Sequence, residues 1–314
     1  MASIQWYPGH MTKTNRQLLE SIKQVDIVVE VLDARIPRAS SNPDIAKMLS
    51  GRQRLIVLNK SDLADASVSA EWKHWFSSIQ VDAVFTDSKT GVGFNAIKTA
   101  LKRIGAEKVR KHAEKGVVQR SVRAMIVGIP NSGKSTLINR LAGKATAKTG
   151  DRPGVTRARQ WVRLEGGIDL LDTPGILWPK FDDEEVARNL AFTGAIKDDI
   201  IDTITLSEQL LEVLLHYYPE KLGIRYNLVN ASVEVESTGI VPAVEETLDA
   251  DPAMKFPLLC QVGKRRGFLL SGGRIDLERT ATMVFDEFRA AKLGRISLER
   301  PELKNTDFKY PDSE

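Results

Sequence analysis

The sequence predicts an α/β fold, a mostly parallel sheet with helices on both faces, followed by a smaller all-α domain. Two observations predict the sheet: β-branched runs such as Val25–Leu32 are apolar on both faces, and helix-like stretches separate them. A third observation predicts the second domain, because apolar residues recur at helical spacing from Asp182 onward. A length of 314 residues is sufficient for two domains.

Composition excludes several classes of protein. The hydrophobic fraction of 42%, the charged fraction of 27% and the net charge of +4 are ordinary for a soluble chain, with or without a nucleic-acid partner. Cys260 is the single cysteine, which excludes an internal disulfide and a cysteine-based zinc cluster. Since neither a membrane-length apolar run nor a signal peptide is present, we expect a cytoplasmic protein without a membrane partner.

The elements of the first domain follow from runs of apolar residues between turn residues. After the buried strand Val25–Leu32, a polar loop contains Pro37 and Pro43. The basic segment Ile104–Arg123 resembles a linker. The other expected elements are helices at Thr14–Gln24, Asp44–Leu49, Glu71–Ser78, Phe94–Lys102 and Thr136–Leu141 and strands at Arg54–Leu58, Val81–Phe85, Ala124–Val127, Gln160–Leu164 and Ile168–Leu171.

The second half of the chain is expected to be helical. We expect the first domain to span residues 1–181, the helical domain residues 182–296 and a polar tail residues 297–314. The helices expected after the first domain are Glu184–Ala195, Leu206–Tyr218, Val244–Leu248 and Asp276–Lys292.

The segment Gly128–Ser135 has the pattern G-x-x-x-x-G-K-S between a predicted strand and a predicted helix. Its glycines let backbone N–H groups turn toward phosphate oxygens, and the helix N-terminus adds its dipole. Lys134 would reach the β- and γ-phosphates, and Ser135 would hold Mg²⁺. The alternative, a turn that binds nothing, is disfavoured by the flanking elements. The residues expected to contact the nucleotide are Pro130, Asn131, Ser132, Gly133, Lys134, Ser135 and Thr136.

A second motif, Asn59-Lys60-Ser61-Asp62, follows the predicted strand Arg54–Leu58. The Asp62 carboxylate can accept from N1–H and the 2-amino group of guanine, whereas adenine presents a lone pair at N1. Asn59 and Lys60 would brace the loop and cover the base. The motif therefore predicts guanine, and it disfavours a P-loop ATPase.

Three weaker elements complete a nucleotide site. After the third strand, Ser88 and Lys89 would cap the base edge, although a plain β–α turn is the alternative. Thr156, in a polar loop, would sense Mg²⁺ and the γ-phosphate, unless this segment is only a Pro-Gly turn. Asp172 would hold the water shell of Mg²⁺, and the N–H group of Gly175 would contact the γ-phosphate.

These elements run base, base, phosphate, switch, switch, which is a circular permutation of the order in ordinary small GTPases. With this order, nearly the whole chain resembles the circularly permuted GTPases of ribosome assembly, most closely the bacterial ribosome biogenesis GTPase A family. Besides the motifs above, the resemblance is carried by Trp6–Met11, Asp33–Arg35, Ser271–Gly273 and Lys292–Arg295. The resemblance implies a permuted P-loop GTPase domain that binds GTP and GDP and hydrolyses GTP with Mg²⁺. It also implies late maturation of the large (50S) ribosomal subunit, with ribosomal RNA and ribosomal proteins rather than DNA as partners.

The permutation changes the surroundings of the second switch. This switch runs on into the C-terminal domain, so nucleotide state should bias the position of that domain. Ile176 stands where many GTPases carry the Gln that orients water, so turnover without a partner should be slow. The resemblance suggests His10 as the catalytic replacement, and a structural histidine that caps the first helix is the alternative. Asn131 resembles the potassium ligand of cation-stimulated GTPases, which would make K⁺ a cofactor.

The C-terminal domain carries basic side chains at Lys264–Arg266 and over Lys292–Arg300. They suit phosphate contacts with ribosomal RNA, although a charged surface is often only solvated. Two other functions remain open: a nucleotide-gated module that binds another RNA or a protein, and a GTPase of small-subunit assembly.

Overall fold

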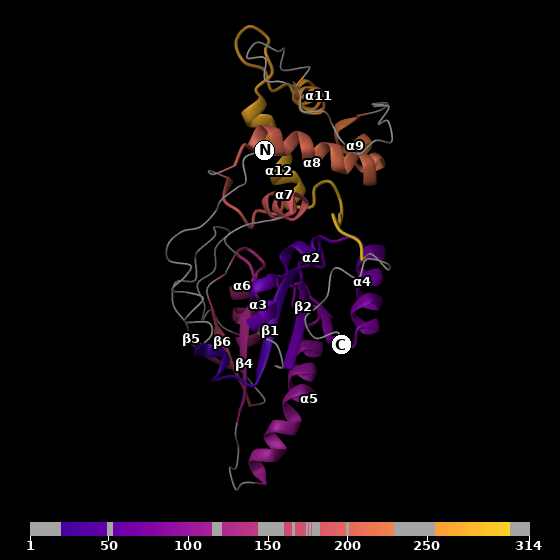
Figure 1. Cartoon of the computed structure of the whole chain (residues 1–314). Helices are drawn as coiled ribbons and strands as arrows, with labels where there is room; N and C mark the ends of the chain where they lie inside the picture. The colour runs from indigo at the N-terminus through magenta and orange to yellow at the C-terminus, as the bar shows by residue number, and fades with distance from the viewer. Residues whose placement is uncertain are drawn as a thin grey trace. The chain divides into compact units, whose positions relative to one another are not determined.

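In the computed structural model, the chain divides into two compact units, residues 1–197 with 295–314, and residues 198–294. The chain thus leaves the first unit after Lys197 and returns to it at Arg295 (Figure 1). Domain boundaries were expected at residues 181 and 296 from the sequence, whereas helix α7, Glu184–Phe192, falls within the first unit. The described residues are 20–48, 53–114, 121–143, 160–164, 167–173, 175, 177, 183–198, 201–228 and 255–301.

The first unit is built on a six-stranded sheet with the order β3-β2-β1-β4-β6-β5. Its neighbouring strands are parallel, except that β5 runs antiparallel to β6. The mostly parallel sheet expected from the sequence is therefore confirmed. The strands are β1 (Ile27–Asp33), β2 (Gln53–Asn59), β3 (Ala83–Phe85), β4 (Val122–Val127), β5 (Gln160–Leu164) and β6 (Ile168–Asp172).

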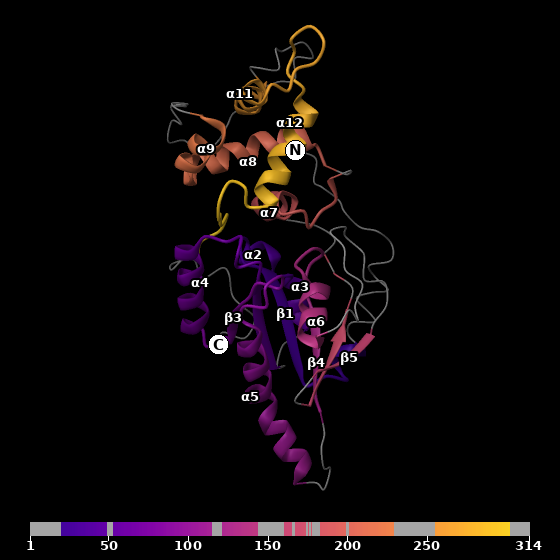
Figure 2. The ribbon, with the colours of Figure 1, turned by 180° about the vertical axis from the view of Figure 1, so that it is seen from behind.

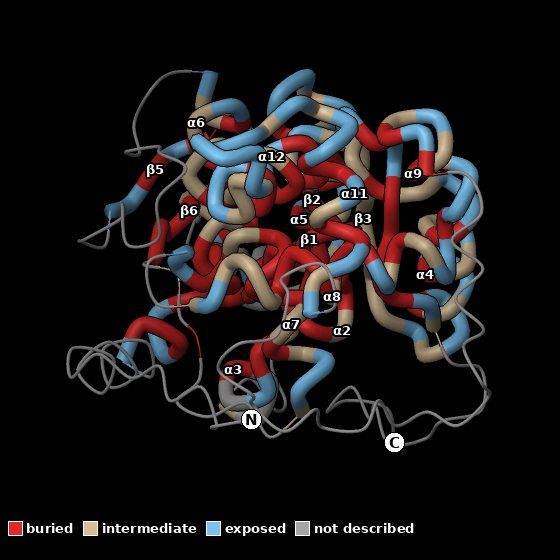
Figure 3. The backbone as a smooth tube through the Cα atoms, turned by 90° about the horizontal axis from the view of Figure 1, so that it is seen from above, coloured by how far each residue is buried: buried red, intermediate tan, exposed pale blue. Residues whose placement is uncertain are grey.

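Helices cover both faces of this sheet because alternate residues of each buried strand point to opposite sides. On one face, Val29 and Leu55 belong to a core that includes residues of α5 (Phe94–Ala113) and α6 (Lys134–Ala142). On the other face, Leu58 packs with residues of α4 (Ala66–Ser78). Figures 1 and 2 show the two sides, and Figure 3 shows that β1 and β2 are buried.

Three stretches of the first unit differ from the sequence prediction. Helix α5 continues to Ala113, so the first part of the expected linker Ile104–Arg123 is helical. The expected polar loop after β1 contains α2 (Pro37–Ser40), which has a proline in its first turn, and α3 spans Pro43–Met48. Helix α4 begins before the predicted residue 71, because Asp65 accepts from the N–H groups of Ser67 and Val68 and caps it.

The second unit contains α8 (Thr203–Tyr217), α9 (Pro219–Tyr226), α11 (Pro257–Arg266) and α12 (Leu277–Arg289). The Glu208 carboxylate of α8 accepts from the N–H groups of Leu258 and Leu259 in the first turn of α11. Helices α9 and α11 were not predicted, although each has a proline in its first turn. The helix predicted at 244–248 lies outside the described residues. None of the described helices has the length and apolar character needed to cross a membrane.

After α12 the chain returns to the first unit in a segment, Arg295–Arg300, that we call the C-terminal strap. Leu298 N donates to Arg35 O, and the indole N–H of Trp72 donates to Glu299 O. Ser297, Leu298 and Glu299 are buried. The part of the expected polar tail that the structure describes, residues 297–301, therefore begins with packed residues.

Candidate nucleotide site

The phosphate loop connects β4 to α6 and is shaped by its glycines. Gly128 has a φ of +150°, and a Cβ on it would lie 2.4 Å from Val31 O of the neighbouring strand. Gly133 has a φ of +91°, and its Cβ would lie 2.2 Å from Asn59 Nδ2. A side chain would therefore collide with backbone at Gly128 and with the Asn59 amide at Gly133, and the positive φ favours glycine at both positions. Pro130 to Ser132 lie in the loop, and Lys134, Ser135 and Thr136 open α6, as the motif predicts.

Lys134 and Asp172 are both buried in the site and interact electrostatically. Burial lowers the pKa of Lys134 to about 8, although the Asp172 carboxylate raises it, and its Nζ donates to Ile129 O at 2.7 Å. Burial raises the pKa of Asp172 to about 6, against the opposing effect of Lys134. Gly175 lies against both the loop and this lysine, because a Cβ on it would be 2.9 Å from Pro130 N and 3.0 Å from Lys134 Nζ. The second switch thus reaches the phosphate loop.

This arrangement fits Mg²⁺. The Oδ1 atom of Asp172 is buried and has no hydrogen-bond partner among the described residues. Such an oxygen suits Mg²⁺ or a water in its coordination shell. Ser135, at the start of α6, would supply the hydroxyl ligand. Thr156, the other predicted ligand, lies outside the described residues, and so does His10.

Asn59 connects the base loop to the two other parts of the site. Its Nδ2 donates to Ser132 O in the phosphate loop at 2.8 Å. Its Oδ1 accepts from Ser88 Oγ at 2.6 Å, from Ser88 N and from Thr86 Oγ1. Asn59 and Ser88 are buried, so these bonds are shielded from water. The structure therefore brings the phosphate loop, the base motif and the third base element together.

Lys60 is held by an ion pair that the sequence analysis did not assign. Its Nζ donates to Asp33 Oδ2 at 2.9 Å, and Arg35 binds the same carboxylate at 2.7 Å. Burial alone would raise the pKa of Asp33, but Arg35 and Lys60 hold it well below its usual range. Asp33 and Asn59 are paired in register at the ends of parallel strands β1 and β2. This ion pair could have been predicted from the position of Asp33 at the carboxyl end of a buried strand, next to the strand that carries Lys60.

Three other predicted residues, Asp62, Lys89 and Asn131, are less buried. Asp62 is partly exposed, and its carboxylate accepts no hydrogen bond from the described part of the chain. Lys89 is exposed, and its N–H group donates to Asp87 Oδ1. Asn131 has a φ of +57°, and its Nδ2 donates to Gly194 O at 2.6 Å. The loop is therefore tied to the turn that follows α7.

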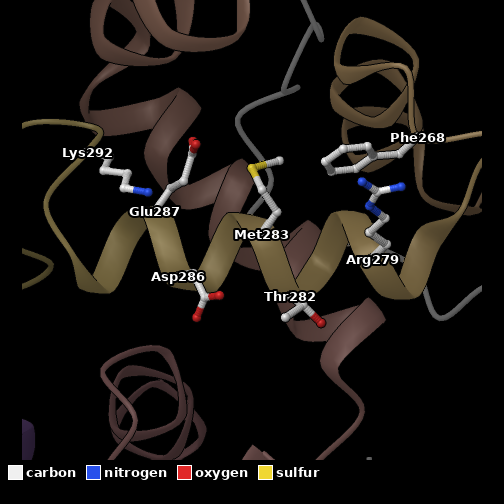
Figure 4. Close-up of a pocket in the computed structure, with 7 residues that line it drawn as sticks. All are labelled: Phe268, Arg279, Thr282, Met283, Asp286, Glu287 and Lys292. Atoms are coloured by element: carbon white, nitrogen blue, oxygen red, sulfur yellow. The ribbon is translucent and has the colours of Figure 1, made fainter.

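A separate pocket of about 360 Å³ lies along α12 in the second unit. In Figure 4 the Arg279 side chain lies against the Phe268 ring, with its guanidinium carbon 4.1 Å from the ring centroid. Lys292 stands at the other end of the pocket. Its lining carries both signs of charge, since Asp286 and Glu287 also contribute.

The chain is similar to known proteins over both units. A family model described as 50S ribosome-binding GTPase matches residues 123–226. Ribosome biogenesis GTPase A of Bacillus licheniformis is 46% identical over 299 residues, which cover 95% of this chain and 99% of that protein. This chain belongs to the ribosome biogenesis GTPase A family. The protein of that name from Thermotoga maritima is 32% identical, with 95% of both chains covered.

Membership of the ribosome biogenesis GTPase A family makes this protein an enzyme that binds GTP and GDP and hydrolyses GTP. The crystal structure of GNP-bound YlqF from T. maritima matches it with a TM-score of 0.60 at 28% identity, over 92% of this chain and 99% of that one. The GDP-bound structure of TM YlqF gives a TM-score of 0.59. The permuted P-loop GTPase fold expected from the motif order is therefore confirmed.

Proposed function

We propose that this GTPase is an assembly factor in late maturation of the large ribosomal subunit. The observation that carries the proposal is the extent of the relationship: 46% identity spans 95% of the chain, so it includes the helical unit as well as the nucleotide site. The relatives are named for ribosome biogenesis, and the matching family model is described as 50S ribosome-binding. A cytoplasmic location agrees with this role.

The helical unit would contact ribosomal RNA through the end of α11. Lys264 and Arg265 are exposed there, whereas Arg266 forms an ion pair with Glu287. Arg295 and Arg300 were expected to contact RNA as well, but they bind groups of the first unit. Exposed lysine and arginine side chains gain affinity for RNA through release of counterions from its phosphates. The proposed RNA surface therefore centres on Lys264 and Arg265.

In hydrolysis, different residues of the chain would bind the phosphates, hold the metal ions and orient the attacking water. Lys134 would bind the β- and γ-phosphates, Asp172 and Ser135 would hold Mg²⁺, and Gly175 would donate its N–H to the γ-phosphate. When bound, Mg²⁺ would supply positive charge to neutralise the charge that develops on the phosphates. His10 would orient the attacking water in place of the missing Gln, and Asn131 would help hold K⁺ near the phosphates.

The test is the initial rate of GTP hydrolysis in potassium buffer, with the protein alone and with isolated large or small ribosomal subunits. We expect slow hydrolysis alone and strong stimulation by the large subunit only, with loss of that stimulation in His10→Ala. Stimulation by the small subunit instead would favour a small-subunit factor. No stimulation by either subunit would contradict the proposal and favour a nucleotide-gated module for another partner.

A further inference from the structure

The C-terminal strap binds the loop that carries Asp62. Arg295 donates from Nε to Ala64 O at 2.7 Å and from Nη2 to Ser61 O at 2.8 Å. These two carbonyls lie on either side of Asp62 in sequence. One guanidinium therefore spans the loop between its first residues and the start of α4.

The main chain of the strap continues this contact. Ile296 N donates to Leu63 O at 2.9 Å, and Asp65 N donates to Ser297 Oγ at 3.1 Å. Ser297 is buried, so its hydroxyl is shielded from competing water. The strap thus binds backbone groups at four positions of the base loop, namely Ser61, Leu63, Ala64 and Asp65.

The opposite side of the loop has fewer such contacts. Ser61 N donates to Thr86 O at 3.0 Å, and Leu63 N donates to Lys60 O within the loop. Lys60 has a φ of +59°, a conformation that costs a non-glycine residue about 1 kcal/mol. The Asp62 carboxylate accepts no hydrogen bond from the described residues, so among them it is the backbone carrying Asp62 that limits where this carboxylate can lie.

We propose that Arg295, together with Ser297, is a positioning residue for guanine recognition. By fixing the backbone on both sides of Asp62, the strap holds that carboxylate where it accepts from N1–H and the 2-amino group of the base. The inference rests on the role that the sequence motif predicts for Asp62, which is recognition of guanine in the proposed GTPase. It adds a determinant from the far end of the chain, adjacent to Gly294, where the chain leaves the second unit.

The experiment compares the affinities of the full-length protein for GDP and for inosine diphosphate, which lacks the 2-amino group. The ratio of the two dissociation constants reports the bond from Asp62 to that group and is insensitive to a uniform loss of folded protein. We expect Arg295→Ala to reduce the preference for GDP about fivefold, as loss of good geometry at one charged hydrogen bond predicts. Ser297→Ala should have a smaller effect in the same direction, and Arg295→Lys should recover part of the preference.

Arg300→Ala is the matched control, because Arg300 lies in the same strap but pairs with Glu71 of α4 rather than with the loop. It should leave the preference unchanged. In an Asp62→Ala background, which should already have lost the preference, Arg295→Ala should cause no further change. If Asp62→Ala removes the preference and Arg295→Ala keeps it, the inference is wrong. If Asp62→Ala itself keeps the preference, the role of Asp62 is wrong, and the inference falls with it.

Discussion

At the scale of single residues, Asn59 is the side chain that connects the parts of the nucleotide site. Its amide donates to the phosphate loop and accepts from Ser88 and Thr86, and it is only 2% exposed. A buried amide with partners on both of its polar atoms fixes the distance between the loop and the base motif. Base and phosphates are parts of one ligand, so this distance bears directly on nucleotide affinity.

Asn59→Ala should weaken both the site and the fold. Loss of these bonds leaves the Ser132 carbonyl and the Ser88 hydroxyl buried without a partner, which should cost about 3 kcal/mol of unfolding free energy. GDP affinity should fall by at least tenfold. Denaturant unfolding and GDP titration would measure the two effects.

Asn59→Asp tests the hydrogen bond to the phosphate loop separately from the bonds to Ser88 and Thr86. A carboxylate can still accept from Ser88 and Thr86, but it repels the Ser132 carbonyl to which the amide donates. We expect GDP affinity to fall nearly as far as in Asn59→Ala. Near-normal affinity in Asn59→Asp would show that the bond to the phosphate loop is dispensable.

At the scale of the element, helix α6 has a left-handed glycine at each end, Gly133 before it and Gly143 after it. Both have positive φ, at +91° and +67°, so alanine is strained at either position. Only Gly133 has a neighbour in the way, since a Cβ on Gly143 would have nothing within 4 Å. Substitutions at these two glycines therefore distinguish the effect of backbone strain, present at both, from the effect of a collision with Asn59, present only at Gly133.

Gly143→Ala should cost about 1 kcal/mol of unfolding free energy and leave GDP binding intact. Gly133→Ala should abolish measurable GDP binding, because its Cβ displaces Asn59 from the loop. Thermal unfolding with and without GDP checks both variants: ligand should stabilise the first and not the second. Equal stabilisation of both by GDP would contradict this account of the loop.

The strap makes stability depend on pH through Glu299. Its carboxylate accepts from the N–H groups of Arg38 and Ala39 and from Asn189 Nδ2. Burial raises its pKa from 4.5 to about 7, because these hydrogen bonds only partly offset desolvation, and Glu185 raises it further. Nearby Arg38 is itself paired with Asp183. The neutral carboxyl is therefore favoured in the folded protein.

Because the folded pKa lies above the unfolded value, the stability from this group is present below about pH 4.5 and is lost as pH rises through 7. The free energy of unfolding should fall by up to about 3 kcal/mol across this interval on account of Glu299. Glu299→Gln should be less stable at pH 5 but lose less on the way to pH 8. Urea unfolding of both proteins at several pH values measures the difference, and parallel curves would show that Glu299 contributes nothing to it.

At the scale of the whole molecule, two connections join the GTPase unit to the helical unit, one after Lys197 and one before Arg295. The first follows α7 and the turn at Gly194, whose carbonyl accepts from Asn131 of the phosphate loop. The second is the strap on the base loop. Both connections therefore follow residues that contact a part of the nucleotide site, and we expect nucleotide state to influence the helical unit through them.

Charge reversal on α11 tests the RNA surface proposed for the helical unit. Lys264→Glu with Arg265→Glu should weaken binding to the large subunit by at least tenfold and reduce its salt dependence, while GDP affinity stays unchanged. Lys73→Glu with Lys102→Glu makes the same change of charge on exposed residues of the first unit. Sedimentation with subunits at several salt concentrations gives the result, and equal weakening by both pairs would indicate only a general effect of net charge.

The sequence by itself determined the sheet, its parallel strands and the residues of the phosphate loop and base motif. These depend on local patterns: apolar runs predict buried strands, and a glycine-rich turn before a helix predicts a phosphate site whatever surrounds it. Local patterns also misled where charge and turn residues were taken as breaks. The basic stretch after Ile104 continues α5, and Pro37, which was expected in a loop, begins α2.

The tertiary structure alone decided how these motifs are held together. Asn59 could be placed in the base motif from the sequence, but its bonds to Ser132 and Ser88 join residues far apart in the chain. The same holds for the ion pair between Asp33 and Lys60. It also holds for the hydrogen bonds from Arg295 to Ser61 O and Ala64 O, which are 234 and 231 residues away in the sequence. Sequence patterns report the conformation that a segment favours, whereas these contacts exist only once folding has brought distant segments together.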